Sequence, residues 1–420
     1  MAQPNYKLTR YACFFSYLSM ASVFVLPSML FTTFHETYGI SYTLLGSLVL
    51  VNFFTQMTID LIFTFFSRFF NIRLTVRVMP LLTSLGLLIY SLVPRLAPQY
   101  TIAGLIVGTV IFSMAAGLSE VLLSPLVAAI PSEHPEKDMS LLHSLYGWGV
   151  VSSVLISSAF FLLFGTNNWF FLALFFASLP IIASILFTIS PTPDINTENS
   201  SKSSGGKGKI IALCVICIFL GSAAENTMTN WISGFMEKAL QIPKAVGDIM
   251  GLAIFALLLA VTRVLYAKFS PDISKTLLIS MIGAAACYIV AGASSAVVLS
   301  FIACILLGVF TSMLWPGTLI LMEQKIHSPG VAAYALMAAS GDMGASVAPQ
   351  LMGIIVDKVS SSRFAAELSQ TSGMTPDEIG LRTGAIITAA FPILGILLLI
   401  YIIRSFSKKT PPNKKADRAA

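Results

Sequence analysis

The sequence predicts an all-helical membrane protein with twelve transmembrane helices arranged as two pseudo-symmetric six-helix halves. Three observations support this prediction: few charged residues, continuous apolar runs of membrane-spanning length, and one polar segment near the middle of the chain. Only 10% of the 420 residues are charged and 56% are hydrophobic, whereas roughly a quarter of the residues in a soluble domain are charged. Such a chain has too few polar side chains to cover the surface of a soluble protein of its size. A soluble enzyme, a disordered scaffold and a secreted disulfide-stabilised domain are therefore excluded.

The apolar runs define the predicted helices. A bilayer core about 30 Å thick requires roughly 20 helical residues, and backbone groups in lipid are satisfied only in helices or closed barrels. The runs in this chain are continuous rather than alternating, so they indicate helices. The predicted spans cover residues 12–33, 42–66, 78–94, 101–130, 139–164, 169–189, 209–236, 245–267, 276–296, 298–324, 330–357 and 382–404.

The distribution of basic residues predicts the orientation of the chain. The N-terminal stretch leads into the first span without a small-residue cleavage site, so we interpret that run as an uncleaved span. The two tails and the even-numbered loops together hold 18 Lys and Arg residues, against six in the odd-numbered loops. Cytoplasmic loops are enriched in Lys and Arg. We therefore expect a multi-pass protein of the cell (inner, cytoplasmic) membrane with both termini in the cytoplasm.

A polar segment, residues 190–208, is rich in Ser, Gly, Pro and Lys and is predicted to be a flexible cytoplasmic linker. It separates an N-terminal half, residues 1–189, from a C-terminal half, residues 209–420, which ends in a basic cytoplasmic tail. The halves are faintly similar, because the segment that starts at Asp60 aligns with the one that starts at Arg263. Two six-span halves related by an axis along the membrane normal are typical of major facilitator superfamily transporters.

Four stretches resemble the fucose-permease-like branch of this superfamily. The matching residues are Gly117, Glu120 and Pro125 in the fourth span, His143, Tyr146, Gly147 and Gly149 in the fifth, Glu225 and Trp231 in the seventh, and Pro349, Gly353 and Asp357 in the eleventh. The first span departs from the pattern. It offers only Ser19 and Ser22 where the fucose permease has a functional aspartate before the proline that resembles Pro27.

The resemblance implies a secondary transporter that moves a small polar, sugar-like solute by alternating access, with a proton as the coupling ion. A proton-coupled exporter of drug-like compounds is the first alternative, although the fifth span has the glycines but not the proline that such exporters favour. A membrane-embedded enzyme or a non-transporting sensor is the second. The sequence has neither the clustered His, Asp and Glu of an enzyme nor the long cytoplasmic segment of a sensor.

Two glutamates, Glu120 and Glu225, are the candidates for carrying the coupling proton. An ionisable side chain deep in a transmembrane helix costs roughly 2.5–3.5 kcal/mol, so it normally faces a cavity or a partner. A carboxyl in a partly dehydrated cavity can take up and release a proton near neutral pH, because burial disfavours its charged form. The alternative is that each glutamate only hydrogen-bonds a neighbouring helix.

Three further ionisable side chains, Asp60, Arg263 and Asp342, are candidate gating residues. Asp60 and Arg263 occupy equivalent places near the cytoplasmic ends of their spans, where ion pairs could latch the two halves. Asp138 and Glu136 are the candidate partners of Arg263. The alternatives are a snorkelling arginine with no mechanistic role, and an Asp342 that tight helix packing buries against a backbone donor.

Deep tryptophans with amides nearby suit a sugar, whose C–H faces stack on aromatic rings while its hydroxyls need paired donors and acceptors. Aromatic side chains that merely fill space between helices are the alternative. The candidate substrate-binding residues are Glu225, Asn226, Asn230, Trp231, Trp315, His143 and Tyr146. His35 lies in a predicted loop and is expected to be solvated.

No cofactor or metal is expected, because the sequence has neither a phosphate-binding lysine loop nor a paired-histidine metal helix. The five cysteines lie in apolar runs, where packing is their expected role. The basic residues form no stripe interleaved with aromatic residues, so no nucleic-acid partner is expected. The expected partners are a small-molecule substrate, the proton and the lipid bilayer. We expect the chain to act as a monomer.

Overall fold

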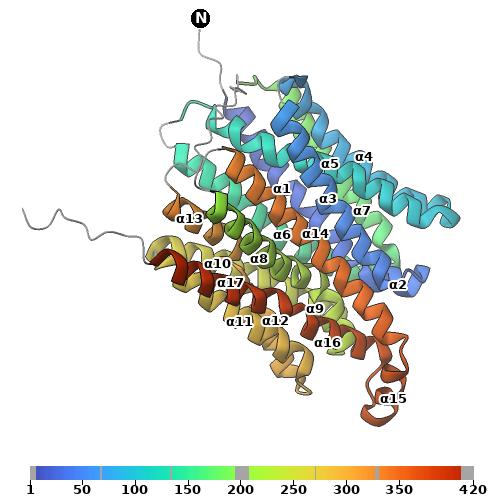
Figure 1. The fold of residues 1–420 in the computed structure, drawn as a ribbon. Helices are drawn as coiled ribbons and strands as arrows, with labels where there is room; N and C mark the ends of the chain where they lie inside the picture. The colour runs from blue at the N-terminus through green and yellow to red at the C-terminus, as the bar shows by residue number, and fades with distance from the viewer. Residues whose placement is uncertain are drawn as a thin grey trace, which may run out of the picture.

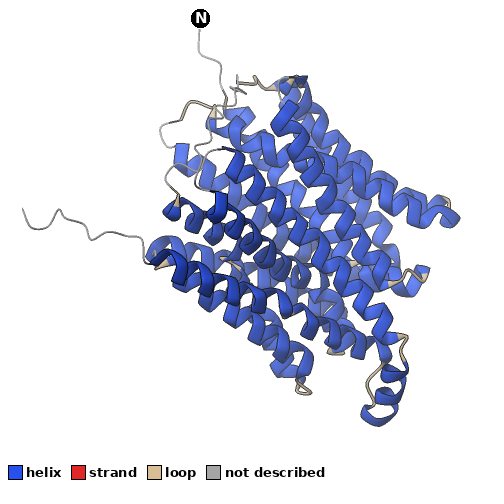
Figure 2. Ribbon diagram, in the orientation of Figure 1, coloured by secondary structure: helices blue, strands red, loops and turns tan. Residues whose placement is uncertain are grey.

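The computed structural model describes residues 6–66, 69–132, 135–193, 208–269, 271–326 and 331–407. Within these ranges the chain forms helices and short connections and contains no strand (Figures 1 and 2). The prediction of an all-helical membrane protein is confirmed. The predicted linker falls mostly on residues 194–207 and the basic tail on residues 408–420, outside the described residues. The boundaries of the two halves therefore stay predictions.

In the described part of the first half there are six long helices and a short one, α2, which the sequence did not predict separately. The helices are α1 (Lys7–Met29), α2 (Phe31–Tyr38), α3 (Tyr42–Phe66), α4 (Ile72–Leu96), α5 (Thr101–Ala128), α6 (Pro135–Phe164) and α7 (Trp169–Ile189), with 3-10 turns η2 (Pro98–Tyr100) and η3 (Thr166–Asn168). The third span begins six residues earlier than predicted. Asn71 caps it by accepting from the Leu74 amide at 3.1 Å, and this cap allows the polar first turn to be helical.

The second half contains more interrupted helices. They are α8 (Gly208–Gly234), η4 (Phe235–Ala239), α9 (Lys244–Gly247), η5 (Asp248–Ala253), α10 (Ile254–Phe269), α11 (Ile273–Ala293), α12 (Val297–Thr311), α13 (Leu314–Lys325), α14 (Val331–Ser360), α15 (Arg363–Ser372), α16 (Pro376–Thr388) and α17 (Ala390–Ser407). The predicted tenth span is broken between α12 and α13, and the twelfth between α16 and α17.

Eleven segments of the described chain are long and apolar enough to cross a membrane. The predicted eleventh span, α14, is not among them, although its 30 residues are ample for a crossing. Its sequence is rich in Ala, Gly and Ser, which lowers its hydropathy but permits close packing. This helix runs beside α3 and α8 in the middle of the bundle (Figure 1).

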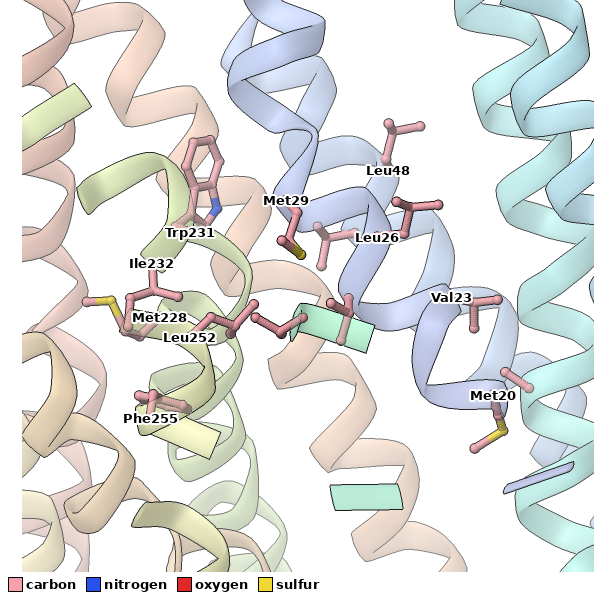
Figure 3. Packing of buried hydrophobic residues seen from close by; sticks show 14 of the residues in the cluster. Met20, Val23, Leu26, Met29, Leu48, Met228, Trp231, Ile232, Leu252 and Phe255 are labelled. Carbon is pink, nitrogen blue, oxygen red and sulfur yellow. The ribbon is translucent and has the colours of Figure 1, made fainter. Parts of the chain in front are cut away.

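Backbone contact between α3 and α14 joins the two halves. A Cβ atom added to Gly353 would lie 2.3 Å from the Tyr42 carbonyl oxygen, and one added to Gly46 would lie 2.9 Å from the Pro349 carbonyl oxygen. Only glycine permits such an approach. Apolar side chains of α1 and α8, including Leu26 of α1, fill the adjoining space (Figure 3).

Candidate functional site

Three carboxyl groups from three membrane-spanning helices come together. Asp60 of α3, Glu120 of α5 and Asp342 of α14 lie close enough to interact electrostatically. Glycine at position 117 makes room for them, because a Cβ atom there would lie 3.2 Å from Asp60 Oδ1. That oxygen is buried and has no hydrogen-bond partner among the described residues. Glu120 is exposed although it lies within a membrane-spanning helix.

A fourth carboxyl, Glu225 of α8, is paired with Arg263 of α10. The Arg263 Nη2 and Glu225 Oε1 atoms are 3.4 Å apart. Arg263 Nε also donates to the Ser312 carbonyl at 2.9 Å. Ser312 lies at the break between α12 and α13, where backbone carbonyls lack intrahelical donors. The guanidinium therefore joins three segments of the C-terminal half.

Among the described side chains Glu225 is the ion-pair partner of Arg263, and the predicted partner Asp138 is not. Asp138 instead pairs with Arg10 at 3.1 Å, near the start of α1. The side chain of Glu136 lies outside the described residues. An ion pair between two spans of the same half was not predicted, because the sequence does not reveal how each helix is rotated about its axis.

Two tyrosines complete the arrangement. The rings of Tyr17 on α1 and Tyr146 on α6 meet edge to face with centroids 6.2 Å apart. Tyr146 interacts electrostatically with Glu120, Glu225 and Arg263, so it lies between the two groups of charges. We call this set the central polar site; its members are Asp60, Glu120, Asp342, Glu225, Arg263, Tyr17 and Tyr146.

The two asparagines predicted to bind substrate lie next to this site on α8. Asn226 Nδ2 donates to the Ser222 carbonyl at 3.1 Å, and Asn230 Nδ2 donates to the Asn226 carbonyl at 2.9 Å. Each amide N–H₂ group is therefore engaged by its own helix, and the side-chain oxygens are the groups left as acceptors.

The predicted tryptophans differ in their surroundings. Trp231 is only 1% exposed, donates from Nε1 to the Pro349 carbonyl at 3.1 Å and packs against Phe31 and Tyr42. It has no free face for a sugar in this conformation, so packing accounts for its position. Trp315 is partly buried against α14, where a Cβ atom at Gly341 would lie 2.4 Å from its Nε1. The side chain of His143 lies outside the described residues.

One end of the bundle, where α2, α9, α15 and the start of α16 gather, brings the two halves into polar contact (Figure 1). Asp357 of α14 accepts from the Tyr42 amide at 3.0 Å and the Thr43 amide at 2.6 Å. These are the first residues of α3, whose amides lack intrahelical acceptors and whose positive end favours a carboxylate. A carboxylate of one half thus caps a helix of the other.

Further contacts join α2 to the C-terminal half at this same end, which we call the closed end. Thr32 donates to Glu237 Oε2 at 2.6 Å, and Lys244 Nζ lies 3.3 Å from Thr32 Oγ1. Glu36 is paired with Lys238. These pairs could not be predicted from the sequence, which shows only that charged residues lie beside spans, because the contacts depend on how the two halves dock.

His35 also belongs to the closed end; it lies in helix α2 rather than in a loop, and its side chain is partly buried, with 31% of it exposed. Its ring stacks on Tyr42 with centroids 4.1 Å apart, and Nε2 lies 3.5 Å from Asp377 Oδ2. By contrast, the predicted gating residues Asp60, Arg263 and Asp342 lie in the central polar site, not at this end. Their gating role stays a prediction.

The chain matches a family model described as Major Facilitator Superfamily over residues 12–349. A comparison with curated proteins finds no match. Among solved structures, an inward-facing, unoccupied bacterial homolog to human lysosomal transporter Spinster has a TM-score of 0.74 at 13% identity, covering 98% of this chain and 100% of that chain. A mutant of the nucleoside transporter NupG has a TM-score of 0.72 at 12% identity, covering 94% and 100%.

The fold is also similar to that of FucP, the fucose:proton symporter of E. coli, in a mutant form. The TM-score is 0.58 at 13% identity, with 94% of this chain and 98% of that chain covered. These structures are similar in fold and architecture, and the family model spans most of the chain. The chain therefore belongs to the major facilitator superfamily and is a membrane transporter rather than an enzyme.

Proposed function

We propose that this protein is a proton-coupled symporter of a small polar, sugar-like solute that works by alternating access. The observation that carries the proposal is the meeting of carboxyls from both halves, Asp60 and Glu120 from the first and Asp342 from the second. Intramembrane carboxyl groups mark ion and proton pathways in transporters. Glu120 has the most exposed side chain of the three and is proposed to load the proton.

The placement of these carboxyls on different halves provides a physical link between proton binding and rocking. When the halves move, the distance from Asp342 to Asp60 and Glu120 changes. The repulsion between ionised carboxyls changes with it. A bound proton removes part of that repulsion, so proton occupancy and the conformational equilibrium bias each other.

The remaining groups of the site support a polar solute. Arg263 is 42% exposed in its side chain and supplies donors, while Glu225 and the asparagine oxygens supply acceptors. Tyr17 and Tyr146 provide aromatic faces. FucP is a fucose:proton symporter and NupG is a nucleoside transporter. Fucose and nucleosides are both small polar solutes with ring faces and hydroxyls.

A proton-coupled exporter of cationic compounds is the second candidate. The central polar site contains four carboxyls and a single arginine, and this excess of acidic groups favours a positively charged cargo. The two proposals differ in the direction of net movement and in the charge of the solute.

The cargo can be identified with a thermal-shift screen of the purified protein against sugars, nucleosides, amino acids and cationic drugs. A ligand at 100 times its dissociation constant adds about 2.7 kcal/mol to stability. Stabilisation by a neutral sugar or nucleoside supports the symporter. Stabilisation by cationic drugs alone overturns it in favour of the exporter.

Glu120→Gln then tests proton coupling with the ligand so identified. Glutamine imitates the permanently protonated carboxyl, so we expect loss of accumulation driven by a pH gradient in proteoliposomes. Exchange of labelled for unlabelled ligand should continue, because exchange needs rocking but no net proton release. Glu367→Gln, on the exposed surface of α15, is the matched control and should accumulate ligand normally. Normal accumulation by Glu120→Gln would show that this glutamate is structural.

A further inference from the structure

The imidazole of His35 lies between the two halves at the closed end, with a hydrogen-bond acceptor facing each ring nitrogen. Nδ1 is 2.9 Å from the Ile40 carbonyl oxygen in its own half. Nε2 is 3.5 Å from Asp377 Oδ2, which belongs to α16 in the other half. The ring also stacks on Tyr42, with 19° between the two planes. His35 itself lies on α2, outside the membrane-spanning segments.

This geometry distinguishes the two charge states of the ring. A neutral imidazole carries one N–H group, whereas the imidazolium carries two. A neutral ring that donates to Ile40 turns the Nε2 lone pair toward the Asp377 carboxylate. A neutral ring that donates to Asp377 turns the Nδ1 lone pair toward the Ile40 carbonyl. Only the imidazolium satisfies both acceptors, and its charge also favours the stacked face of Tyr42.

The charged groups around His35 lie on α16, on α14 and on its own helix, α2. Asp377 on α16 and Asp357 on α14 both act on the ring electrostatically. Glu36, the next residue of α2, is paired with Lys238 of η4. The hydrogen bond to Asp377 is the largest influence and raises the pKa of His35 above its usual 6.5, and desolvation opposes it.

We propose that His35 is a proton-operated latch whose protonated ring holds α2 of the first half against α16 of the second, and whose deprotonation weakens the closed end. The latch is a regulatory device separate from cargo coupling in the central polar site. It does not rest on the proposed function, because its contacts involve none of the carboxyls of that site.

The direction of the pH dependence follows from linkage. The contact with Asp377 exists only when the end is closed, so the pKa of His35 is higher in the closed form than in the open one. The contribution of His35 to closure is therefore complete below its pKa in the open form, where the contact with Asp377 is absent. It is lost as pH rises through the higher closed-form pKa. A single proton changes the closed-to-open ratio by at most about tenfold per pH unit.

The latch can be tested by measuring the distance between the halves without any substrate. Spin labels at Asn167→Cys and Gln370→Cys, both exposed, report on the first and second halves at the closed end. The five native cysteines are replaced, and double electron–electron resonance is recorded in lipid nanodiscs between about pH 5.5 and about pH 8.5, which spans the usual titration range of histidine. We expect the closed fraction to fall as pH rises.

Two variants separate the latch from other titrating groups. In His35→Gln, the closed-to-open ratio should change less with pH than in the parent, and only the change set by the carboxyls of the central polar site should remain. In Asp377→Asn, the midpoint should move to lower pH, because the neutral amide stabilises the imidazolium less. Glu367→Gln should keep the parent profile. A parent profile that is flat over this range, or a His35→Gln profile that matches the parent, overturns the proposal. Either result leaves the Glu120 experiment unaffected.

Discussion

Arg382 joins three segments of the C-terminal half with a single buried guanidinium. It donates to Glu378 Oε1 at 2.9 Å, to the Ser294 carbonyl at 2.6 Å and to the Ala239 carbonyl at 3.0 Å. Ser294 ends α11 and Ala239 ends η4. Carbonyls at helix C-termini lack intrahelical donors and attract positive charge. One arginine of α16 therefore satisfies the ends of two neighbouring segments.

Arg382→Met should destabilise the protein substantially. The substitution leaves the Glu378 carboxylate and two carbonyls without their buried donor, and removal of one partner of a buried ion pair costs about 3–5 kcal/mol. Thermal or denaturant unfolding of the purified protein measures the change. Arg363→Met, on an exposed position of α15, is the matched control and should unfold like the parent. Equal stability of both variants would show that Arg382 contributes no more than a surface arginine.

Single residues also show what the sequence could predict about the site. Depth alone singled out Asp60, Glu120, Glu225, Arg263 and Asp342, since ionisable groups are costly inside a span, and the structure places all five in one site. Depth could not give their pairing, because that depends on helix rotation. The same limit applies to Trp231. Its depth was correct, but whether its ring faces a cavity or a neighbouring helix depends on packing between halves.

At the scale of elements, the pair formed by α3 and α14 controls how closely the halves approach. Gly353 lies directly against the first turn of α3, which Asp357 caps one turn further along α14. Close packing and a charge-assisted cap thus act on the same few residues. A change in helix spacing at Gly353 must therefore also lengthen the bonds made by Asp357.

Gly353→Ala should shift the equilibrium toward opening of the closed end. The added methyl would lie 2.3 Å from the Tyr42 carbonyl oxygen, so the two helices must separate. Overpacking typically costs about 1–3 kcal/mol, all of it borne by the closed form. The Asn167–Gln370 spin-label pair should show a larger open fraction. Gly147→Ala, at a helical glycine with open space around it, should leave the distances unchanged. Identical distributions for Gly353→Ala and the parent would contradict this role.

The helices that could be predicted from the sequence are those whose length and position are set by hydropathy. The short helices and the helix breaks could not be predicted in this way. The spans followed from apolar length, as for α7, because lipid contact requires that length. The short helices α2 and α15 lie outside the spans. Helix α15 is defined by a Ser362 cap and a left-handed Gly373 rather than by hydropathy. The break after α12 precedes Pro316, which has no N–H to donate to the Ser312 carbonyl four residues earlier, and Arg263 of another helix donates to that carbonyl instead.

At the scale of the whole molecule, the two ends of the bundle differ: the polar contacts between the halves lie at one end, and most basic residues lie at the other. The closed end is built from α2, η4, α9 and the start of α16, which the sequence assigns to the outside. The basic residues gather at the other end, where 18 of the Lys and Arg residues are predicted, against six at this one. This excess of basic residues on one side sets the orientation that the chain takes when it inserts into the bilayer. The orientation thus predicts that the protein is latched on its external side.

Accessibility of single cysteines should establish this orientation. In a chain without native cysteines, we expect Ser372→Cys, at the end of α15, to react with an impermeant thiol reagent in intact cells. Ser203→Cys, in the predicted linker, should react only after the cells are permeabilised. The physical reason is the excess of basic residues, each of which resists translocation across the membrane. Permeabilised cells also provide the control, because both positions should then react. Labelling of Ser203→Cys but not Ser372→Cys in intact cells would reverse the topology, and the His35 latch would then sense the pH of the cytoplasm instead of the outside.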